Sequence, residues 1–328
     1  MTAPMAAIPV GAEQAAPATM QALIGAAPCS RIGFGTGGLL RIGSARARQS
    51  VLAAALGNGI THFDTAPVYG FGESERALGR FLRGQRARVT LTTKFGLRPS
   101  RLAARLAPLQ RAARSVIKQF PQLRQVAARN TGPLYSSPCF SAAAIRDSLE
   151  SSLRSLRTDY VDFYLAHQAS GDSMPSEDAI GILEDLRRAG KIRAFGVATE
   201  FDWLLPVLQA RPQLGGVAQF DSEVGRGNVA ALHVESSRLI ITYGFINRAI
   251  AACRERMGNA LPADGFERTD DDTLGALLLR AAVIENAHGI VLMQSRSISR
   301  IERNVRAAHD AAADDRVRRL VSLLEPQM

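Results

Sequence analysis

Four polar side chains stand where predicted strands end, and each is of a type that can hold or transfer a proton. Asp64 ends the run GITHFD, Tyr69 follows five residues later, Lys94 ends VTLTTK, and His167 ends YVDFYLAH. A strand buried on both faces has little reason to finish on an ionisable group. In a parallel α/β barrel, however, catalytic side chains gather at the C-terminal strand ends. We therefore expect these four residues to meet at one rim as a proton-transfer site.

The four side chains have complementary chemistry. Tyr69 is the natural proton donor, because an unperturbed phenol has a pKa of about 10. Charged Lys94 nearby would stabilise phenolate and lower the pKa of Tyr69, while Asp64 would keep Lys94 charged and oriented. His167 could donate a hydrogen bond to a substrate oxygen. The set suits carbonyl reduction, in which hydride reaches carbon and a proton reaches oxygen. None of the four donates hydride, so a nicotinamide cofactor would be required.

Each residue also has a purely structural interpretation. Asp64 and Lys94 could form a structural ion pair, Tyr69 could be a packed loop aromatic, and His167 could be a core histidine bonded to backbone. Taken singly, these interpretations are as good as the catalytic ones. The occurrence of all four at predicted strand ends favours a shared site.

The elements that must position these residues alternate between short β-branched runs and stretches of helical period, which is typical of repeated βα units. Eight strands are expected, near 31–36, 60–64, 89–94, 160–166, 192–197, 216–220, 238–243 and 289–293. Serines at 44, 141 and 176 are placed to cap three of the intervening helices. Eight such units in about 300 residues predict a single-domain (β/α)8 barrel.

Two long stretches and one terminal segment interrupt this rhythm. Residues 97–140 form an insertion after the third strand, with basic and apolar residues at helical spacing, and residues 244–272 follow the seventh strand. Both leave the rim that carries the four polar residues, so both could wall a pocket. A basic amphipathic helix can also lie on a membrane, but packing against the barrel is the simpler interpretation. The Ala- and Pro-rich residues 1–28 are expected to be a poorly ordered extension, leaving 29–328 as the barrel.

Charge and cysteine content restrict the partners. The formal net charge is +10, and no acidic residue occurs between Glu75 and Asp147. A solvated basic face is the simplest explanation, followed by a phosphate-bearing ligand. No nucleic-acid-binding motif accompanies the charge, and no apolar run is long enough to span a membrane. The three cysteines are widely separated, which favours reduced thiols and a cytoplasmic location and gives no metal-ligand spacing. We expect a small-molecule partner; the oligomeric state is not encoded in these patterns.

Several segments resemble the aldo-keto reductase family. FDTAPVYGFGESERALG is similar to its most specific motif, LTTKFG and SLESSLRSLRTDYVDFYLAHQ to its lysine and histidine segments, and LEDLRRAGKIRAFGVA to the approach to its fifth strand. The resemblance runs from about 31 to 310. It implies a (β/α)8 barrel that binds NADP(H) without a Rossmann fold. It also implies a tetrad with Tyr69 as acid/base, Lys94 and Asp64 as its tuners, and His167 as carbonyl orienter.

The same resemblance implies a set of cofactor residues. Gln219 matches the glutamine that bonds the nicotinamide carboxamide, and Tyr243 matches the aromatic that stacks on the ring. The adenosine-phosphate clamp of the family falls on Ser295, Arg296, Ser297, Arg300 and Asn304. Hydroxyl and guanidinium groups near a helix start suit a 2′-phosphate. Two positions depart from the pattern: Ala198-Thr199 replace the usual Ser-Asn, and Gln294 stands where the clamp opens, so NAD(H) is also possible.

The expected activity is thus hydride transfer between NADP(H) and an aldehyde or ketone, or the corresponding alcohol, and a sugar is compatible with it. Three alternatives remain open. Gly33, Gly35 and Gly38 satisfy GxGxxG, but no acidic residue follows at the spacing a dinucleotide fold needs. His62 and Asp64 could begin a metal-hydrolase site, although the eighth strand ends in Met293-Gln294 without a carboxylate. A cofactor-binding regulatory or interaction subunit with little turnover is compatible with the same barrel.

Overall fold

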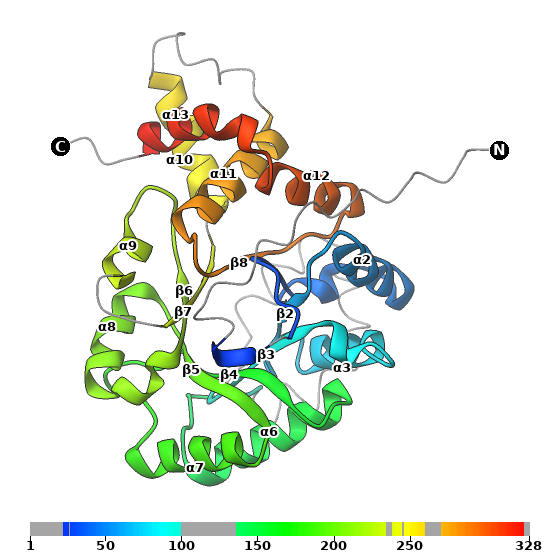
Figure 1. The fold of residues 1–328 in the computed structure, drawn as a ribbon, viewed down its shortest axis with the longest axis vertical. Helices are drawn as coiled ribbons and strands as arrows, with labels where there is room; N and C mark the ends of the chain where they lie inside the picture. Colours follow the sequence, from blue (N-terminus) through cyan, green and yellow to red (C-terminus); the bar gives the residue numbers. More distant parts are fainter. Residues whose placement is uncertain are drawn as a thin grey trace, which may run out of the picture.

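The structure is a computed structural model that describes residues 22–25, 27–99, 136–233, 238–244, 246–259 and 270–324. Eight parallel strands follow one another in chain order and close into a barrel, with the eighth paired to the first (Figure 1). The strands are β1 (Ile32–Gly35), β2 (His62–Asp64), β3 (Thr90–Phe95), β4 (Val161–His167), β5 (Ile192–Ala198), β6 (Val217–Asp221), β7 (Leu239–Tyr243) and β8 (Ile290–Met293). All eight expected strands are confirmed, and with them the (β/α)8 fold.

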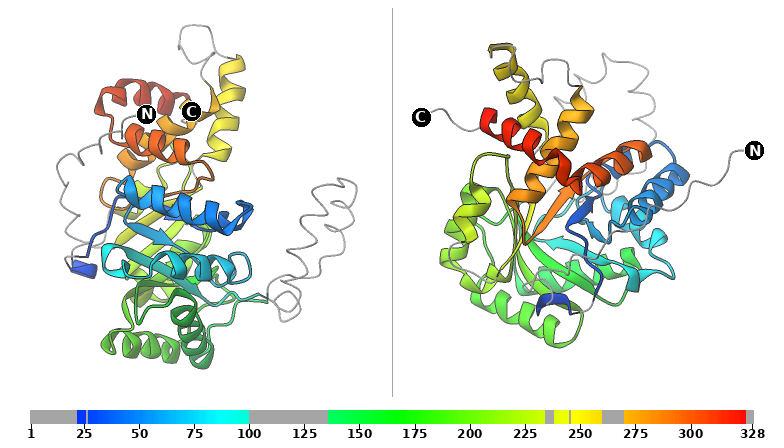
Figure 2. Two further views of the ribbon diagram at one scale, coloured as in Figure 1. Left: turned by 90° about the vertical axis from the view of Figure 1, so that its right-hand side faces the viewer. Right: turned by 45° about the horizontal axis from the view of Figure 1, so that its top comes forward.

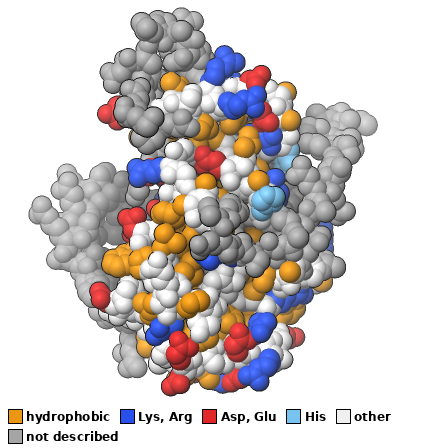
Figure 3. Space-filling view, turned by 60° about the vertical axis from the view of Figure 1, so that its left-hand side comes forward, with side chains coloured by type: hydrophobic (Ala, Val, Ile, Leu, Met, Phe, Trp, Pro, Cys, Tyr) orange, Lys and Arg blue, Asp and Glu red, His pale blue; other side chains and the backbone are white. Residues whose placement is uncertain are grey.

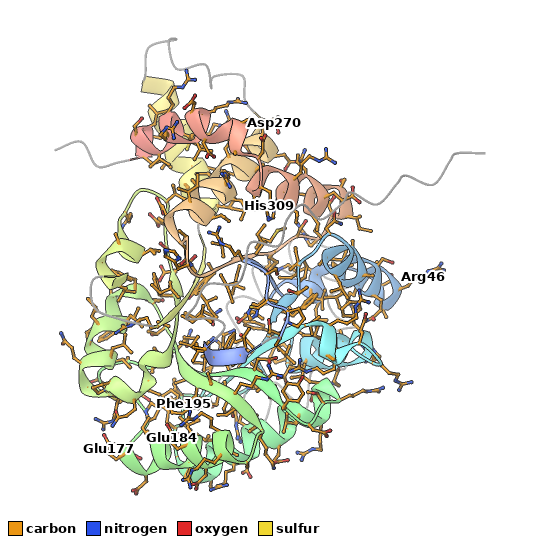
Figure 4. All side chains as sticks on the ribbon, viewed as in Figure 1. Arg46, Glu177, Glu184, Phe195, Asp270 and His309 are labelled. Atoms are coloured by element: carbon orange, nitrogen blue, oxygen red, sulfur yellow. The ribbon has the colours of Figure 1, made fainter. Side chains whose placement is uncertain are left out.

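Helices surround this barrel in both Figure 1 and Figure 2. They are α2 (Ala45–Gly57), α3 (Glu73–Phe81), α6 (Ala142–Leu156), α7 (Glu177–Arg188), α8 (Phe201–Ala210), α9 (Asn228–His233), α10 (Asn247–Asn259), α11 (Asp271–Glu285), α12 (Ile298–Ala308) and α13 (Asp314–Leu324). Four 3-10 turns, η1 (Leu39–Arg41), η2 (Arg86–Arg88), η3 (Pro212–Gly216) and η5 (Ala311–Ala313), complete the described elements. Polar side chains such as those of Arg46 and Glu177 project from the outer faces of the helices (Figure 4). Phe195 of β5, by contrast, is buried between the barrel and the helices around it.

The expected helix caps are present. The side chains of Ser44, Ser141 and Ser176 accept hydrogen bonds from the backbone N–H three residues later, which satisfies an otherwise unpaired donor at each helix start. At the other end of α7, Gly190 adopts a φ of +71°, the left-handed conformation that glycine allows at little cost. Local sequence signals therefore set these helix boundaries.

The glycines of the first strand serve packing. A Cβ on Gly33 would lie 2.5 Å from Leu292 Cδ2 and 2.8 Å from His62 Cδ2, so a larger residue would displace barrel side chains. A Cβ on Gly38 would likewise overlap the Gln294 side chain. The GxGxxG pattern thus belongs to a barrel strand and the loop that follows it.

The segments that interrupt the βα rhythm are described only in part. The helix expected within 97–140 lies outside the described residues, apart from 97–99 and 136–140. In the stretch 244–272 the structure contains α10. The expected N-terminal extension is described only at 22–25 and 27–28. There Ile24 packs into the barrel core, and its carbonyl accepts a hydrogen bond from Arg193 Nη1 at 2.7 Å. Within the described residues, no helix combines the length and apolar character needed to span a membrane.

Candidate active site

A buried ion pair lies at the centre of the site. Lys94 and Asp64 end neighbouring strands, and each is only 2% exposed. The Lys94 ammonium donates to both carboxylate oxygens of Asp64, at 2.8 and 2.7 Å, and to the carbonyl of Thr65 at 3.0 Å. Although burial alone disfavours a charged amine, the Asp64 carboxylate and the Tyr69 oxygen together hold the pKa of Lys94 above its usual value. Lys94 therefore remains charged.

The Tyr69 hydroxyl meets this ion pair. Lys94 Nζ lies 3.3 Å from the Tyr69 oxygen and can donate a hydrogen bond to it. Burial raises the pKa of Tyr69 and outweighs the opposing effect of Lys94. Lys94 lowers the pKa of Tyr69 as expected, but desolvation of the phenolate dominates, so the net pKa lies above its usual value. Tyr69 is a neutral phenol, the form that can give a proton.

The imidazole of His167 lies beside the phenol. The two rings meet edge to face, with centroids 6.1 Å apart. Burial, aided by the positive charge of Lys94, lowers the pKa of His167 to about 3. His167 is thus neutral at physiological pH, and its Nδ1 is buried with no hydrogen-bond partner in the described part of the chain. A neutral imidazole retains one N–H that can be donated to a substrate oxygen.

Gln219 extends this group from the opposite side of the barrel. Its Nε2 donates to Asp64 Oδ2 at 2.9 Å, so the carboxylate receives hydrogen bonds from both Lys94 and Gln219. Gln219 is 2% exposed, and its Oε1 has no hydrogen-bond partner among the described residues. A buried amide oxygen left unpaired is costly. An amide N–H₂ group arriving from a ligand would satisfy it.

At the neighbouring strand end, Ala198 provides no polar side-chain atom, and the Thr199 hydroxyl is already engaged. Thr199 Oγ1 donates to the carbonyl of Ala169 at 2.7 Å, in the loop that follows β4. The hydroxyl can still accept a hydrogen bond but cannot donate a second one. The structure therefore assigns Thr199 a role in holding the rim together.

Tyr243 ends β7, directly opposite Asp221 of β6. It is partly buried against the apolar residues of the barrel interior. Burial raises the pKa of Tyr243, and the nearby carboxylate of Asp221 raises it further. Tyr243 is therefore a neutral aromatic at the rim, suited to stacking against a flat ligand ring.

The residues expected to form the phosphate clamp lie together at the end of β8 and the start of α12. Ser297 caps α12, and its hydroxyl accepts from the Arg300 N–H. Ser295 Oγ accepts from the Ser297 N–H at 3.1 Å, and Ser295 and Asn304 are both buried. Helix N-termini are natural phosphate sites because their backbone N–H groups and the helix dipole favour an anion.

Gln294 ties this corner to the catalytic group. Its Oε1 accepts a hydrogen bond from the Gly38 N–H at 3.0 Å. The preceding residue, Gly37, faces both the Gln294 side chain and the Tyr69 ring. The loop after β1 thus lies between the catalytic residues and the clamp.

Arg300, one of the two arginines expected in the clamp, is already engaged by an acidic residue that sequence reasoning missed. Asp272, in the first turn of α11, accepts from Arg300 Nη2 through Oδ1 at 2.8 Å and from Arg303 Nη2 through Oδ2 at 2.5 Å. Asp272 lies 28 residues before Arg300 in the chain, and no local pattern links the two. A 2′-phosphate bound by Arg300 would have this carboxylate as a neighbour.

Comparison with known proteins identifies the family of proteins to which this chain belongs. The model of the aldo/keto reductase family matches residues 31–205, which is more than half of the chain and includes Asp64, Tyr69, Lys94 and His167. The chain belongs to the aldo/keto reductase family.

Curated aldo-keto reductases also match about half of the chain. The chain is 34% identical over 175 residues to the aldo-keto reductase YhdN of Bacillus subtilis, covering 52% of this chain and 43% of that protein. It is 32% identical over 143 residues to an NADH-specific methylglyoxal reductase of Escherichia coli, covering 43% of this chain and 37% of that protein. The match thus spans about two fifths of the length of either relative.

Solved aldo-keto reductases share the whole fold. A holo-form enzyme from Bacillus halodurans aligns with a TM-score of 0.66 at 21% identity, over 90% of this chain and 92% of that one. An aldo-keto reductase from Klebsiella pneumoniae in complex with NADPH aligns with a TM-score of 0.59 at 21% identity, over 92% and 93%. The second half of the chain therefore keeps the barrel although its sequence has diverged further.

The alternative of a metal-hydrolase site at His62 and Asp64 finds no support in the geometry of the described residues. Both ring nitrogens of His62 face threonine hydroxyls, Thr90 at 3.0 Å and Thr92 at 3.3 Å. The Lys94 ammonium lies against the Asp64 carboxylate, in the position that a metal cation would need. Among the described residues, no three His, Cys, Asp or Glu side chains are grouped as metal ligands would be.

Proposed function

We propose that this aldo-keto reductase interconverts an aldehyde or ketone and the corresponding alcohol with NADP(H), with Tyr69 as general acid and base. The observation that carries the proposal is the buried contact of Tyr69 with charged Lys94, which Asp64 holds in place. In the reducing direction the neutral phenol gives its proton to the carbonyl oxygen. Lys94 then stabilises the phenolate that remains. In the oxidising direction the same phenolate takes the proton back.

His167 supports this step by orienting the substrate. Its neutral imidazole can donate one N–H to the carbonyl oxygen without contributing a competing positive charge. This polarises the carbonyl and directs its oxygen toward the Tyr69 hydroxyl. Protonating His167 would change this hydrogen bonding, but its low pKa keeps the ring neutral over the physiological range.

The proposed cofactor site fits a nicotinamide nucleotide. The unpaired Gln219 oxygen suits the amino group of a carboxamide, and Tyr243 offers a stacking face. Ser295, Arg296, Ser297, Arg300 and Asn304 provide hydroxyl, guanidinium and amide groups for the adenosine phosphate. When bound, the cofactor supplies the hydride that no side chain can provide. The Klebsiella pneumoniae structure with NADPH and the NADH-specific Escherichia coli relative support a nicotinamide cofactor and leave both forms in the proposal.

The first test is parallel titration with NADPH and NADH, followed by reduced-nicotinamide fluorescence. Tighter binding of NADPH would support the clamp. Tight binding of NADH alone would move the proposal to an NAD-linked dehydrogenase. If neither cofactor binds, hydride transfer at this site is refuted. Binding without turnover would favour the regulatory-subunit alternative.

The second test removes the Tyr69 hydroxyl. Tyr69→Phe should lower turnover by about 10²–10⁴-fold, the usual contribution of a general acid, and should leave cofactor binding nearly unchanged. A panel of small aldehydes, ketoaldehydes and sugars, chosen with the named activities of the relatives in mind, would supply the substrate. Tyr160→Phe, at the start of β4 and so at the other end of the barrel, is the matched control. If Tyr69→Phe keeps full turnover, the acid/base assignment is wrong.

A further inference from the structure

A strongly basic cavity lies on the outside of the barrel, between α3 and α6. Its volume is about 340 Å³, and it is lined by Arg76, Arg80, Ser151, Arg154, Ser155 and Arg157. This part of the chain includes the segment without acidic residues between Glu75 and Asp147. The tetrad and the cofactor residues do not explain this cavity.

The close contact of the two helices brings these side chains together. A Cβ on Gly79 of α3 would lie 2.3 Å from the carbonyl oxygen of Ser155, so only glycine permits the approach. Arg76 and Arg80 are four residues apart and share one face of α3. On α6, Ser151, Arg154 and Ser155 present the facing row. The cavity therefore combines guanidinium forks with hydroxyl groups from two rigid helices.

Most of the cavity lies toward the end of the barrel where the strands begin, although Arg76 reaches back to the carbonyl of Phe71, in the loop after β2, at 3.5 Å. Arg86, shortly after α3, donates to the carbonyls of Val89 and Tyr160, the residues directly before β3 and β4. The C-terminal ends of α3 and α6 therefore lie where these strands begin, whereas Lys94 and His167 lie where the strands end. A ligand in the cavity would not touch the tetrad.

Three of the four arginines have no acidic partner among the described residues. Arg76 pairs with Glu73 at 3.1 Å, but no carboxylate is paired with Arg80, Arg154 or Arg157. The neighbouring acidic residues are engaged elsewhere: Glu75 is buried and accepts from Thr93 Oγ1 at 2.8 Å, and Glu150 pairs with Lys191. Two exposed acidic residues that are close in sequence add negative charge to this region: Asp147, four residues before Ser151 on α6, and Asp159, two residues after Arg157.

The arginines of α7 show the opposite pattern. Arg187 pairs with Glu184 at 2.7 Å and Arg188 with Asp185 at 2.6 Å. Toward the lower end of the view in Figure 3, where α7 lies, acidic and basic side chains are accordingly intermixed. Basic side chains near a helix C-terminus do stabilise the helix, because they interact favourably with the negative end of its dipole. One per helix would serve that purpose, however, and unpaired guanidiniums around one cavity repel each other.

We propose that this α3–α6 cavity is a binding site for an oligophosphate, a compact anion with two or three linked phosphate groups. Planar guanidinium forks match phosphate oxygens in pairs, and the serine hydroxyls add donors. A cavity of this size suits a small ligand. An extended nucleic acid would need a continuous basic track.

The test is calorimetric titration of the full-length protein with inorganic tripolyphosphate at low ionic strength. Arg80→Gln/Arg154→Gln should weaken binding by about tenfold or more, because charge-assisted hydrogen bonds to phosphate are lost. Glutamine keeps helix propensity at both positions. Arg318→Gln/Arg319→Gln, on α13, removes the same charge elsewhere and should leave the affinity within about twofold. Thermal unfolding of each variant controls for folding.

A further variant separates this site from the proposed cofactor clamp. Arg296→Gln/Arg300→Gln should retain the tripolyphosphate binding that the α3–α6 variant loses. Equal affinities for tripolyphosphate and a nucleoside triphosphate would show that the phosphate chain alone is recognised; tighter nucleoside triphosphate would assign the site to the nucleotide form. The proposal is overturned by no binding to the parent protein, by equal weakening in the α13 variant, or by loss of all binding in the clamp variant. Preferential binding of a single-stranded oligonucleotide at these arginines would also overturn it.

Discussion

Replacing Asp272 by asparagine should improve NADPH binding selectively. The Asp272 carboxylate holds Arg300 and Arg303, and Arg300 is the proposed ligand of the 2′-phosphate. For the phosphate to engage Arg300, it must compete with this carboxylate and remain near its negative charge. Asparagine keeps the size of the side chain and removes the charge. The change therefore tests competition within the clamp without creating a cavity.

The magnitude follows from the exposure and spacing of the groups. The side chains of Arg300 and Asp272 are 50% and 38% exposed, so the ion pair itself contributes about 0.2–1 kcal/mol. A phosphate bound on the other side of the guanidinium would lie about 6 Å from the carboxylate, at two contact distances of about 3 Å. With a phosphate charge of about −1.5, the repulsion in water is about 1 kcal/mol. Together these effects amount to about 1–2 kcal/mol and predict NADPH binding about 8–30-fold tighter in Asp272→Asn.

NADH lacks the 2′-phosphate, so its affinity should change by less than about twofold. Asp271→Asn is the matched control, because Asp271 is the adjacent residue, carries the same charge, and pairs with Arg254 at 2.8 Å and not with α12. Fluorescence titrations at low and high salt would measure both cofactors, and salt should reduce the effect. The reasoning is refuted if Asp272→Asn weakens NADPH, which would make Asp272 a positioning residue for Arg300, or if Asp271→Asn gives the same gain.

Three further predictions concern the barrel interior and rim. Asp64→Asn or Lys94→Met alone should each cost about 3–5 kcal/mol of unfolding free energy, because each leaves a buried charge unpaired. Urea denaturation should show that the double variant recovers most of this loss. Strictly additive losses would contradict the ion-pair argument. Burial lowers the pKa of His62 from 6.5 to about 3, so below pH 6.5 the unfolded chain binds a proton that the folded protein excludes. His62 should therefore remove about 2 kcal/mol of stability at pH 5. His62→Gln should reduce the dependence of stability on pH between 7 and 5 by that amount and leave the similar contribution of His167; an unchanged slope would count against it. Ala198→Ser/Thr199→Asn restores the usual family pair and should raise the affinity for both cofactors by about fivefold, through an added hydrogen bond worth about 1 kcal/mol. An unchanged or lower affinity in the titrations would show instead that loss of the Thr199–Ala169 hydrogen bond distorts the rim.

The strands and the meeting of the candidate catalytic residues were predictable because their signals are local. β3 and β4 are buried on both faces, so they read as nearly continuous β-branched and apolar runs, and the polar residue at the end of each is conspicuous. Parallel closure of the barrel then brings these ends to one rim. Lys94 meets Asp64 for this reason, although 30 residues separate them.

Contacts that depend on side-chain direction between distant elements were not predictable. Nothing near Gln219 shows that its amide donates to Asp64, and nothing near Arg300 reveals its pairing with Asp272. The net pKa of Tyr69 was also beyond sequence reasoning, since the neighbouring charge can be inferred from spacing but the degree of desolvation cannot. Arg76 and Arg80 belong to the basic segment after Glu75 that was visible in the sequence, yet their meeting with Arg154 and Arg157 around a cavity required the close approach of α3 and α6 at Gly79.

The order of the strands divides the site between two halves of the chain. Asp64, Tyr69, Lys94 and His167 all come from β2 to β4 and the loop after β2, whereas the residues assigned to the cofactor come from β6 to β8 and the start of α12. Each half contributes adjacent strands of the same closed barrel, so the proposed proton-transfer residues and the proposed cofactor residues occupy separate, contiguous stretches of the chain. Substitutions in the second stretch can therefore change the cofactor preference without touching the first, and the family match, which covers residues 31–205, contains the first stretch and not the second.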